Sequence, residues 1–251
     1  MPKFDFDALT KTLSEYSPNV SKLSSAAAQA THAVALVIIS FLLMLELMNT
    51  YQLFKREGGS LNVKLIAELA LRYLIAILLV HYFSVITSSI LWLFNGIASL
   101  IQTALGTETA TINYDIGKVK GITKQIISLI VWATENIAAI TGNILILLRY
   151  LEMYVLEIIG PVIVPFYMLE STKQLSINVF KHFGAAALQG VLLVIVMSIY
   201  PALMTDALLE VNVSDGAQVV SVAISSIAKG IIFIMLMVGT NRRAKQLFGV
   251  M

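Results

Sequence analysis

Long apolar runs separated by short polar stretches form the pattern of this chain. The runs extend from about Thr31 to Leu53, Val63 to Ala98, Met153 to Leu169, Phe183 to Leu203 and Val219 to Val238. Runs of about 20 residues match an α-helix that crosses roughly 30 Å of hydrocarbon. A backbone in lipid must satisfy its own hydrogen bonds, so we expect each run to be helical. The pattern predicts an all-α, polytopic helical membrane protein with about five transmembrane helices.

The composition supports a membrane setting. The 251 residues are 58% hydrophobic and 13% charged, and the mean hydropathy is +0.84. Soluble domains carry about 25% charged residues, so this chain falls outside their range. The absence of cysteine excludes disulfides and thiolate metal sites, and a net charge of +2 is too small to indicate nucleic-acid binding. The sequence contains no phosphate loop, metal-ligand spacing or nucleophile motif, so we expect no enzyme activity, metal or cofactor.

The two ends of the chain differ from its apolar body. Residues 1–28 lack the basic start and apolar core of a secretory signal, so we expect this segment to be retained. Apolar residues recur in it at spacings of four and three: Leu9, Leu13, Tyr16, Val20 and Leu23. This spacing predicts one face of an amphipathic helix despite Pro18, with a partly disordered tail as the alternative. We therefore divide the chain into an N-terminal segment, 1–28, a transmembrane domain, 29–240, and a basic tail, 241–251.

The stretch from Ile122 to Leu169 is too long for one ordinary span. It contains no strong helix breaker before its C-terminal part except Gly142. Two interpretations remain open. The stretch forms two spans with a tight turn near Gly142, or one span preceded by an interfacial or protruding helix.

The distribution of Lys and Arg predicts the orientation in the cytoplasmic membrane. Basic residues occur in the first connection, in a polar hinge from Glu170 to His182 and in the tail: Lys55, Arg56, Lys64, Lys173, Lys181, Arg242, Arg243 and Lys245. The connection from Asp206 to Gln218 contains only acidic charges, namely Asp206, Glu210 and Asp215. By the positive-inside rule the basic connections are cytoplasmic and the acidic one is external. This predicts an external N-terminus, a cytoplasmic C-terminus and an odd number of spans.

Charged residues inside the apolar runs are candidates for polar contacts. Each costs roughly 3 kcal/mol at a helix centre, so such residues usually face a bundle interior, a partner or water. The candidates for an intersubunit contact or a conduit lining are Glu46, Arg149, Glu152 and Glu157. An alternative is that Arg149 and Glu152, three residues apart, neutralise each other. Glu68 and Arg72 are four apart, so we expect them to share a helix face and pair.

Two prolines four residues apart, Pro161 and Pro165, predict a kinked or partly unwound helix next to Gly160. The carbonyls that lose their donors need new partners, which implies burial against other protein. The following span opens with small residues that form a smooth surface: Gly184, Ala185, Ala186, Ala187 and Gly190. We expect this close-packing face to receive the kinked helix, either as plain hairpin packing or with a gating role.

This hairpin carries a family resemblance. The Gly/Pro-containing helix from Leu156 to Leu169, the polar hinge, and the stretch from Phe180 to Val191 with its small residues and Gln189-Gly190 resemble the TrbL-type polytopic subunit of conjugative type IV secretion systems. That family includes the sixth VirB protein. The resemblance covers about 50 of the 251 residues. The chain departs from the family in two ways: only Phe180 represents the aromatic residue of the hinge, and the loop from Ser99 to Lys120 is short.

The resemblance implies a membrane scaffold or channel subunit that helps pass a DNA–protein substrate across the cytoplasmic membrane. Its implied partners are further copies of the chain, other type IV secretion subunits including ATPases, membrane lipids and, transiently, single-stranded DNA. The basic hinge and tail would dock the cytoplasmic ATPases or the substrate. Asp206, Glu210 and Asp215 would surround an external mouth.

Two other functions fit a membrane protein with a broken helix and internal charges. A secondary transporter or small-solute channel is the main alternative, because transporters bind substrates at discontinuous helices. The sequence shows no internal repeat to support it. A pore-forming or phage-like lytic protein is the other alternative.

Overall fold

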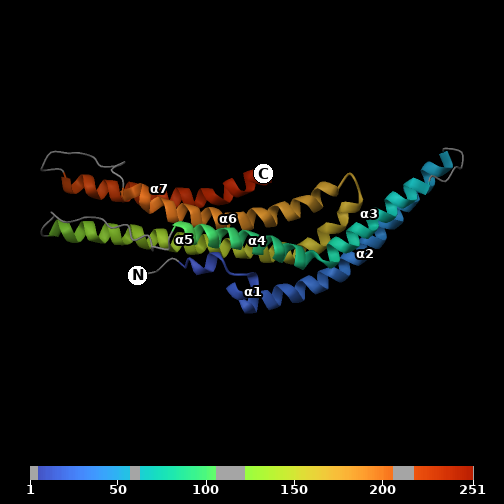
Figure 1. Cartoon of the computed structure of the whole chain (residues 1–251), viewed down its shortest axis with the longest axis horizontal. Helices are drawn as coiled ribbons and strands as arrows, with labels where there is room; N and C mark the ends of the chain where they lie inside the picture. Colours follow the sequence, from blue (N-terminus) through green and yellow to red (C-terminus); the bar gives the residue numbers. More distant parts are fainter. Residues whose placement is uncertain (1–4, 57–62, 106–121, 206–217, 251) are drawn as a thin grey trace. The chain divides into compact units, whose positions relative to one another are not determined.

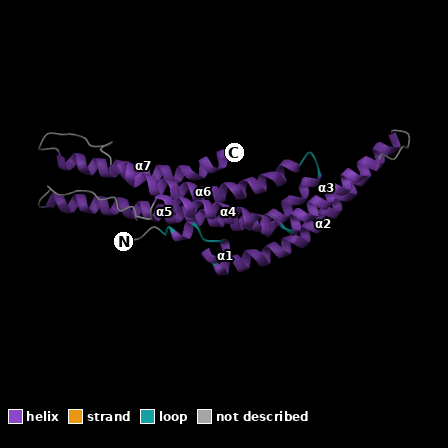
Figure 2. Cartoon of the chain, viewed as in Figure 1, coloured by secondary structure: helices purple, strands orange, loops and turns teal. Residues whose placement is uncertain are grey.

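The computed structural model describes residues 5–56, 63–105, 122–205 and 218–250. Every regular element in these ranges is a helix, which confirms the all-α prediction (Figure 2). The elements in chain order are η1 (Asp7–Leu9), α1 (Leu13–Tyr16), α2 (Pro18–Arg56), α3 (Val63–His81), α4 (Phe83–Leu105), α5 (Ile122–Ile163), η2 (Val164–Met168), α6 (Lys173–Thr205) and α7 (Gln218–Leu247).

Three helices among the described residues are long and apolar enough to cross a membrane. They contain the segments Pro18–Gln52, Phe83–Leu105 and Lys173–Tyr200. Apolar helices of this length define a helical membrane protein. The count of about five spans stays a prediction.

The chain divides into two compact units, and each is described by itself. Unit 1 comprises residues 1–11, 94–149 and 188–244, and unit 2 comprises residues 12–93, 150–187 and 245–251. Helices α4, α5, α6 and α7 each contribute residues to both units.

The N-terminal segment does not form the expected single amphipathic helix. Thr12 caps α1 in a capping box, because its hydroxyl accepts from the Glu15 N–H and the Glu15 carboxylate accepts from the Thr12 N–H. The backbone is extended at Ser17, and Pro18 then begins α2, where a missing N–H costs no helical bond. The five apolar residues therefore lie on η1, α1 and α2 and not on one continuous helix, and an amphipathic role of the segment stays a prediction.

Helices α2 and α3 lie side by side in unit 2 and run antiparallel (Figure 1). The core of this unit joins residues from α2, α3, α4, η2 and α6: Ala35, Ile39, Leu42, Ala76, Val80, Phe83, Val164, Met168 and Val179. The three α2 residues recur at spacings of four and three, which places them on one helix face. This face explains why η2, α2 and α3 pack together.

The long apolar segment predicted from Val63 to Ala98 is interrupted at Tyr82. Helix α3 ends at His81 and α4 begins at Phe83. Backbone hydrogen bonds nevertheless continue through the junction, from the Tyr82 N–H to the Leu78 carbonyl and from the Ile86 N–H to the Tyr82 carbonyl, both at 2.9 Å. The interruption is therefore local.

Helix α5 continues without a break through Gly142. Its 42 residues correspond to roughly 63 Å of helix, about twice the hydrocarbon thickness. The interpretation with a tight turn at Gly142 is therefore wrong. A continuous helix longer than one span agrees with the other interpretation.

The connection before α6 is shorter than the expected hinge. Helix α6 begins at Lys173, so Lys173 and Lys181 lie on its first three turns instead of in a loop. Only residues 169–172 separate η2 from α6. The predicted hinge is therefore too long, because the first turns of α6 are polar and polarity alone does not distinguish them from a loop.

Candidate functional site

The bend at the end of α5 is the feature that the two prolines predict. Pro161 lies inside α5, and the helix gives way at Val164 to the 3-10 helix η2, which contains Pro165. Proline has no N–H to donate and its ring clashes with the preceding turn. Regular α-helical geometry therefore ends between the two prolines, where a tighter 3-10 helix follows it.

Hydroxyl groups at the start of α6 and in the turn before it donate hydrogen bonds to carbonyls of the bend. The Ser176 hydroxyl, in a residue that is 1% exposed, lies 3.0 Å from the Ile163 carbonyl oxygen and 2.9 Å from that of Val164. The Thr172 hydroxyl donates to the Phe166 carbonyl at 3.0 Å. Protein groups therefore replace donors that the unwound backbone cannot supply.

Gly160 brings an aromatic ring close to the bend. A Cβ atom added at Gly160 would lie 2.0 Å from Cζ of Phe83. Phe83 is buried, and its ring centroid lies 5.5 Å from that of Phe180 on α6. The lack of a side chain at Gly160 is therefore what lets Phe83 occupy this position.

The predicted close-packing face is buried in the structure. Gly184 receives the ring of Phe248 in unit 2, where an added Cβ would lie 2.6 Å from Cε1. Gly190 receives the guanidinium of Arg149 in unit 1, where an added Cβ would lie 2.3 Å from Nη1. Ala185, Ala186 and Ala187 are buried too. The hydrogen bonds from α6 to the bend come instead from Ser176, earlier on the helix.

Arg149 forms a buried polar cluster in unit 1. The residue is 1% exposed, and its Nη1 donates to the Leu9 carbonyl at 3.1 Å while Nη2 donates to Oδ1 of Asn95 at 3.4 Å. The Asn95 amide also donates to the Lys11 carbonyl at 2.9 Å. Arg149 and Asn95 therefore hold residues 9–11 of the chain. Sequence reasoning missed Asn95, although an amide in the apolar middle of α4 was a usable signal.

The other predicted internal charges occupy separate environments. In unit 2, Glu152 pairs with Lys245 at 2.9 Å, and Glu157 accepts a hydrogen bond from the Ser24 hydroxyl at 2.9 Å. Glu46 is partly exposed, and no hydrogen bond or ion pair joins it to another described residue. Within unit 2, Glu152 and Glu157 therefore have different partners, and an intersubunit or conduit role of the four residues stays a prediction.

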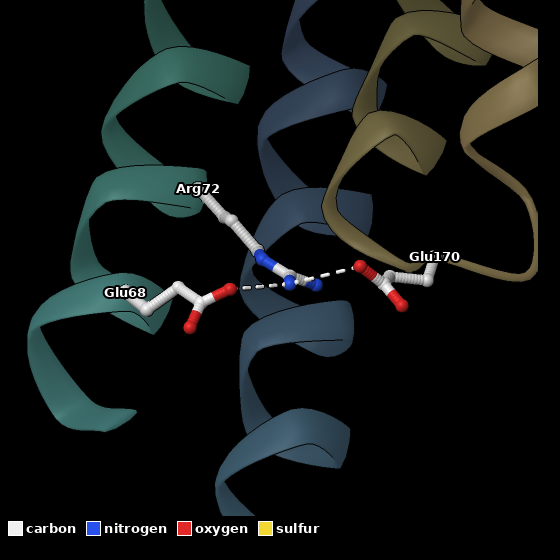
Figure 3. Close-up of polar contacts among 3 residues, drawn as sticks. All are labelled: Glu68, Arg72 and Glu170. Carbon is white, nitrogen blue, oxygen red and sulfur yellow. Dashed lines mark hydrogen bonds and ion pairs between the residues drawn. The ribbon is translucent and has the colours of Figure 1, made fainter. Parts of the chain in front are cut away.

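The predicted pair of Glu68 and Arg72 is confirmed. Nη2 of Arg72 lies 2.7 Å from Oε1 of Glu68 and 3.1 Å from Oε1 of Glu170, which follows η2 (Figure 3). One guanidinium therefore links α3 to the connection before α6. All three side chains are at least partly exposed, so solvent screens this network.

Two histidines that are 49 positions apart in the sequence approach each other in unit 2. The ring centroids of His32 and His81 lie 6.2 Å apart in an edge-to-face arrangement. Both rings line a cavity of about 370 Å³ that Glu157 also lines. Within the described ranges, no three His, Cys, Asp or Glu side chains are grouped closely enough to hold a metal ion. The acidic mouth predicted at Asp206, Glu210 and Asp215 lies outside the described residues.

Apolar helices of membrane-spanning length define a helical membrane protein, and its last α5 turns carry a buried proline. Residues 73–240 match the TrbL/VirB6 plasmid conjugal transfer protein family. This range is more than half of the chain and includes the bend and α6, so the chain belongs to that family and is a component of conjugal transfer by type IV secretion. No curated protein sequence matches the chain significantly.

Proposed function

We propose that this chain is an integral scaffold or channel subunit of a conjugative type IV secretion system, and that it helps a DNA–protein substrate cross the cytoplasmic membrane. The observation that carries the proposal is the family match, which covers the proline bend and the helix that follows it. The apolar segments of α2, α4 and α6 support an integral rather than a peripheral role.

The proposed partners follow from two features: the sequence has no nucleotide-binding motif, and the end of α7 carries exposed positive charges. The sequence contains no phosphate-binding loop, so separate ATPases drive transfer. Arg242 and Arg243 are exposed near the end of α7, where they offer cations to a cytoplasmic partner or to the substrate. Repeated copies of the chain surround the transfer path, and Glu46 is the candidate for contacts between them.

A donor strain tests this proposal directly. Deletion of the gene should abolish conjugative transfer, and expression of the wild-type chain in trans should restore it. Rapid leakage of a dye from cells that express the chain without other conjugation genes would instead favour the lytic alternative. Saturable solute uptake by reconstituted protein, with normal transfer by the deletion strain, would favour the transporter.

The proposed topology has a clean test because the chain contains no cysteine. Asn19 is exposed at the start of α2, and Leu247 is 71% exposed at the end of α7. In Asn19→Cys an impermeant maleimide should label intact cells, whereas in Leu247→Cys it should react only after permeabilisation. The opposite labelling pattern would reverse the proposed orientation.

A further inference from the structure

A cavity in unit 2 lies between α2, the junction of α3 and α4, and α5, and its volume is about 370 Å³. This volume falls within the range of sites that take small ligands, roughly 300–1,000 Å³. Its polar lining comes from all three sides: Ser25, Gln29, His32, His81, Ser84 and Glu157. The α2 residues of this set recur at spacings of four and three, so one face of α2 presents them together.

The charge of the lining favours a cationic ligand. Glu157 is the only carboxylate among the lining residues, and these residues include no Lys or Arg. The Ser24 hydroxyl donates to Oε2 of Glu157 at 2.9 Å and fixes the carboxylate at the cavity wall. A carboxylate binds a primary ammonium through short charge-assisted hydrogen bonds. Hydroxyl, amide and imidazole groups around it can accept the remaining ammonium protons.

An exposed apolar stripe begins where the polar lining ends. On α2 the sequence changes at His32 from polar to apolar, and Leu36, one turn later, is 42% exposed. On α3, Leu78 and Leu74 lie three and seven residues before His81 and are 45% and 54% exposed. The two helices run antiparallel (Figure 1), and the ring centroids of His32 and His81 lie 6.2 Å apart. Residues after His32 on α2 and residues before His81 on α3 therefore follow the helix pair in the same direction from the cavity. Tyr82, which is 49% exposed at the junction, is a residue type enriched at membrane–water interfaces.

We propose that this cavity binds the headgroup of a phospholipid that carries a primary ammonium, such as phosphatidylethanolamine. Glu157 is the counter-ion of the ammonium, and the acyl chains lie along Leu36, Leu74 and Leu78. A polar pocket that opens onto an apolar stripe fits a molecule with the same two parts. This inference does not depend on the role of the chain in DNA transfer.

Native mass spectrometry of the full-length protein tests the proposal. The protein is released from mixed micelles with equal amounts of phosphatidylethanolamine, phosphatidylcholine and phosphatidylglycerol. We expect wild type to retain phosphatidylethanolamine preferentially, because the quaternary ammonium of phosphatidylcholine has no N–H and phosphatidylglycerol has no cation. Glu157→Gln should reduce this preference by about ten- to a hundredfold, the range that one charge-assisted hydrogen bond covers.

Two further variants keep the test decisive. Ala28 lines the cavity without a polar group, so Ala28→Trp should fill the space and abolish retention even with Glu157 intact. Glu68→Gln makes the same chemical change on α3 outside the cavity and should leave lipid retention unchanged. Equal retention of all three lipids by wild type would overturn the proposal. So would a preference that survives both Glu157→Gln and Ala28→Trp, or binding of free ethanolamine in this site without any retained lipid.

Discussion

The bend after α5 and the cluster around Arg149 differ in what they lack: the bend lacks hydrogen-bond donors, whereas the buried Arg149 side chain needs acceptors. At the bend, the regular α-helix ends at Ile163 and nearby carbonyls lose their helical donors, and the Ser176 and Thr172 hydroxyls donate to three of them. At Arg149 a buried side chain carries excess donors, and the Leu9 carbonyl and the Asn95 amide accept from it. In both regions a polar group inside an apolar protein is matched by a partner from elsewhere in the chain. The comparison indicates that the more highly charged site should be the more costly to disrupt.

The largest effect is expected at Arg149. Arg149→Met removes the guanidinium and leaves two buried neutral acceptors, the Leu9 carbonyl and Oδ1 of Asn95, without that donor, so we expect the free energy of unfolding to fall by about 2–6 kcal/mol, at about 1–3 kcal/mol for each acceptor. The protein is heated in detergent, and the fraction that still elutes as folded protein in size-exclusion chromatography measures this loss of stability. Limited proteolysis should also become faster near residues 9–11. Arg149→Lys keeps the charge without the planar fork, so its stability should lie between those of wild type and Arg149→Met. Unchanged stability in both variants would show that the cluster does not stabilise the fold.

An intermediate effect is expected at Gly160. In Gly160→Ala the new Cβ would overlap the Phe83 ring, so the ring or the helix must move, at a cost of about 1–3 kcal/mol. Phe83→Leu in the same chain should recover part of this loss, because a smaller side chain leaves room for the methyl group. A double-mutant cycle on thermal stability gives the coupling. Strict additivity of the two changes would show that the contact does not control the fit.

A smaller effect is expected at Ser176. Ser176→Ala removes the hydroxyl within reach of two carbonyls of the bend, and we expect a loss of about 1–2 kcal/mol in thermal stability. The matched control is Ser40→Ala, since the exposed Ser40 hydroxyl bonds only to the Leu36 carbonyl of its own helix. An equal loss in the two variants would argue that the bend gains nothing specific from Ser176.

The smallest effect is expected at Arg72, where the charges are in contact with solvent. Arg72→Ala breaks both ion pairs of Figure 3, yet exposed pairs contribute only about 0–1 kcal/mol. The change in stability should shrink further at high salt. A loss as large as that of Arg149→Met would contradict the contrast between buried and exposed charges.

The parts of the fold that depend on local chemistry could be predicted from the sequence. Helical character follows from the apolar runs, the unwinding follows from Pro161 and Pro165, and the pairing of Glu68 with Arg72 follows from their spacing. The family resemblance of the hairpin is also confirmed by the match over residues 73–240.

The errors arose where tertiary contacts or element ends decide the outcome. The first turns of α6 are polar yet helical, and a new helix begins at Pro18 where the spacing predicts one helix running through it. Gly142 lies inside α5 because a single glycine costs a helix only about 1 kcal/mol. The partners of Arg149 and the approach of His32 to His81 join residues far apart in the chain. Spacing within one segment carries no information about such contacts.

Conjugation by a donor strain that carries the double substitution Pro161→Ala and Pro165→Ala tests the central claim most directly. The bend should straighten into a continuous helix, since both missing backbone donors are restored. We predict normal abundance in the membrane together with a mating frequency close to that of the deletion strain. Wild-type mating frequency at equal abundance, with the helix shown to be straight, would contradict the claim that transfer requires the bend.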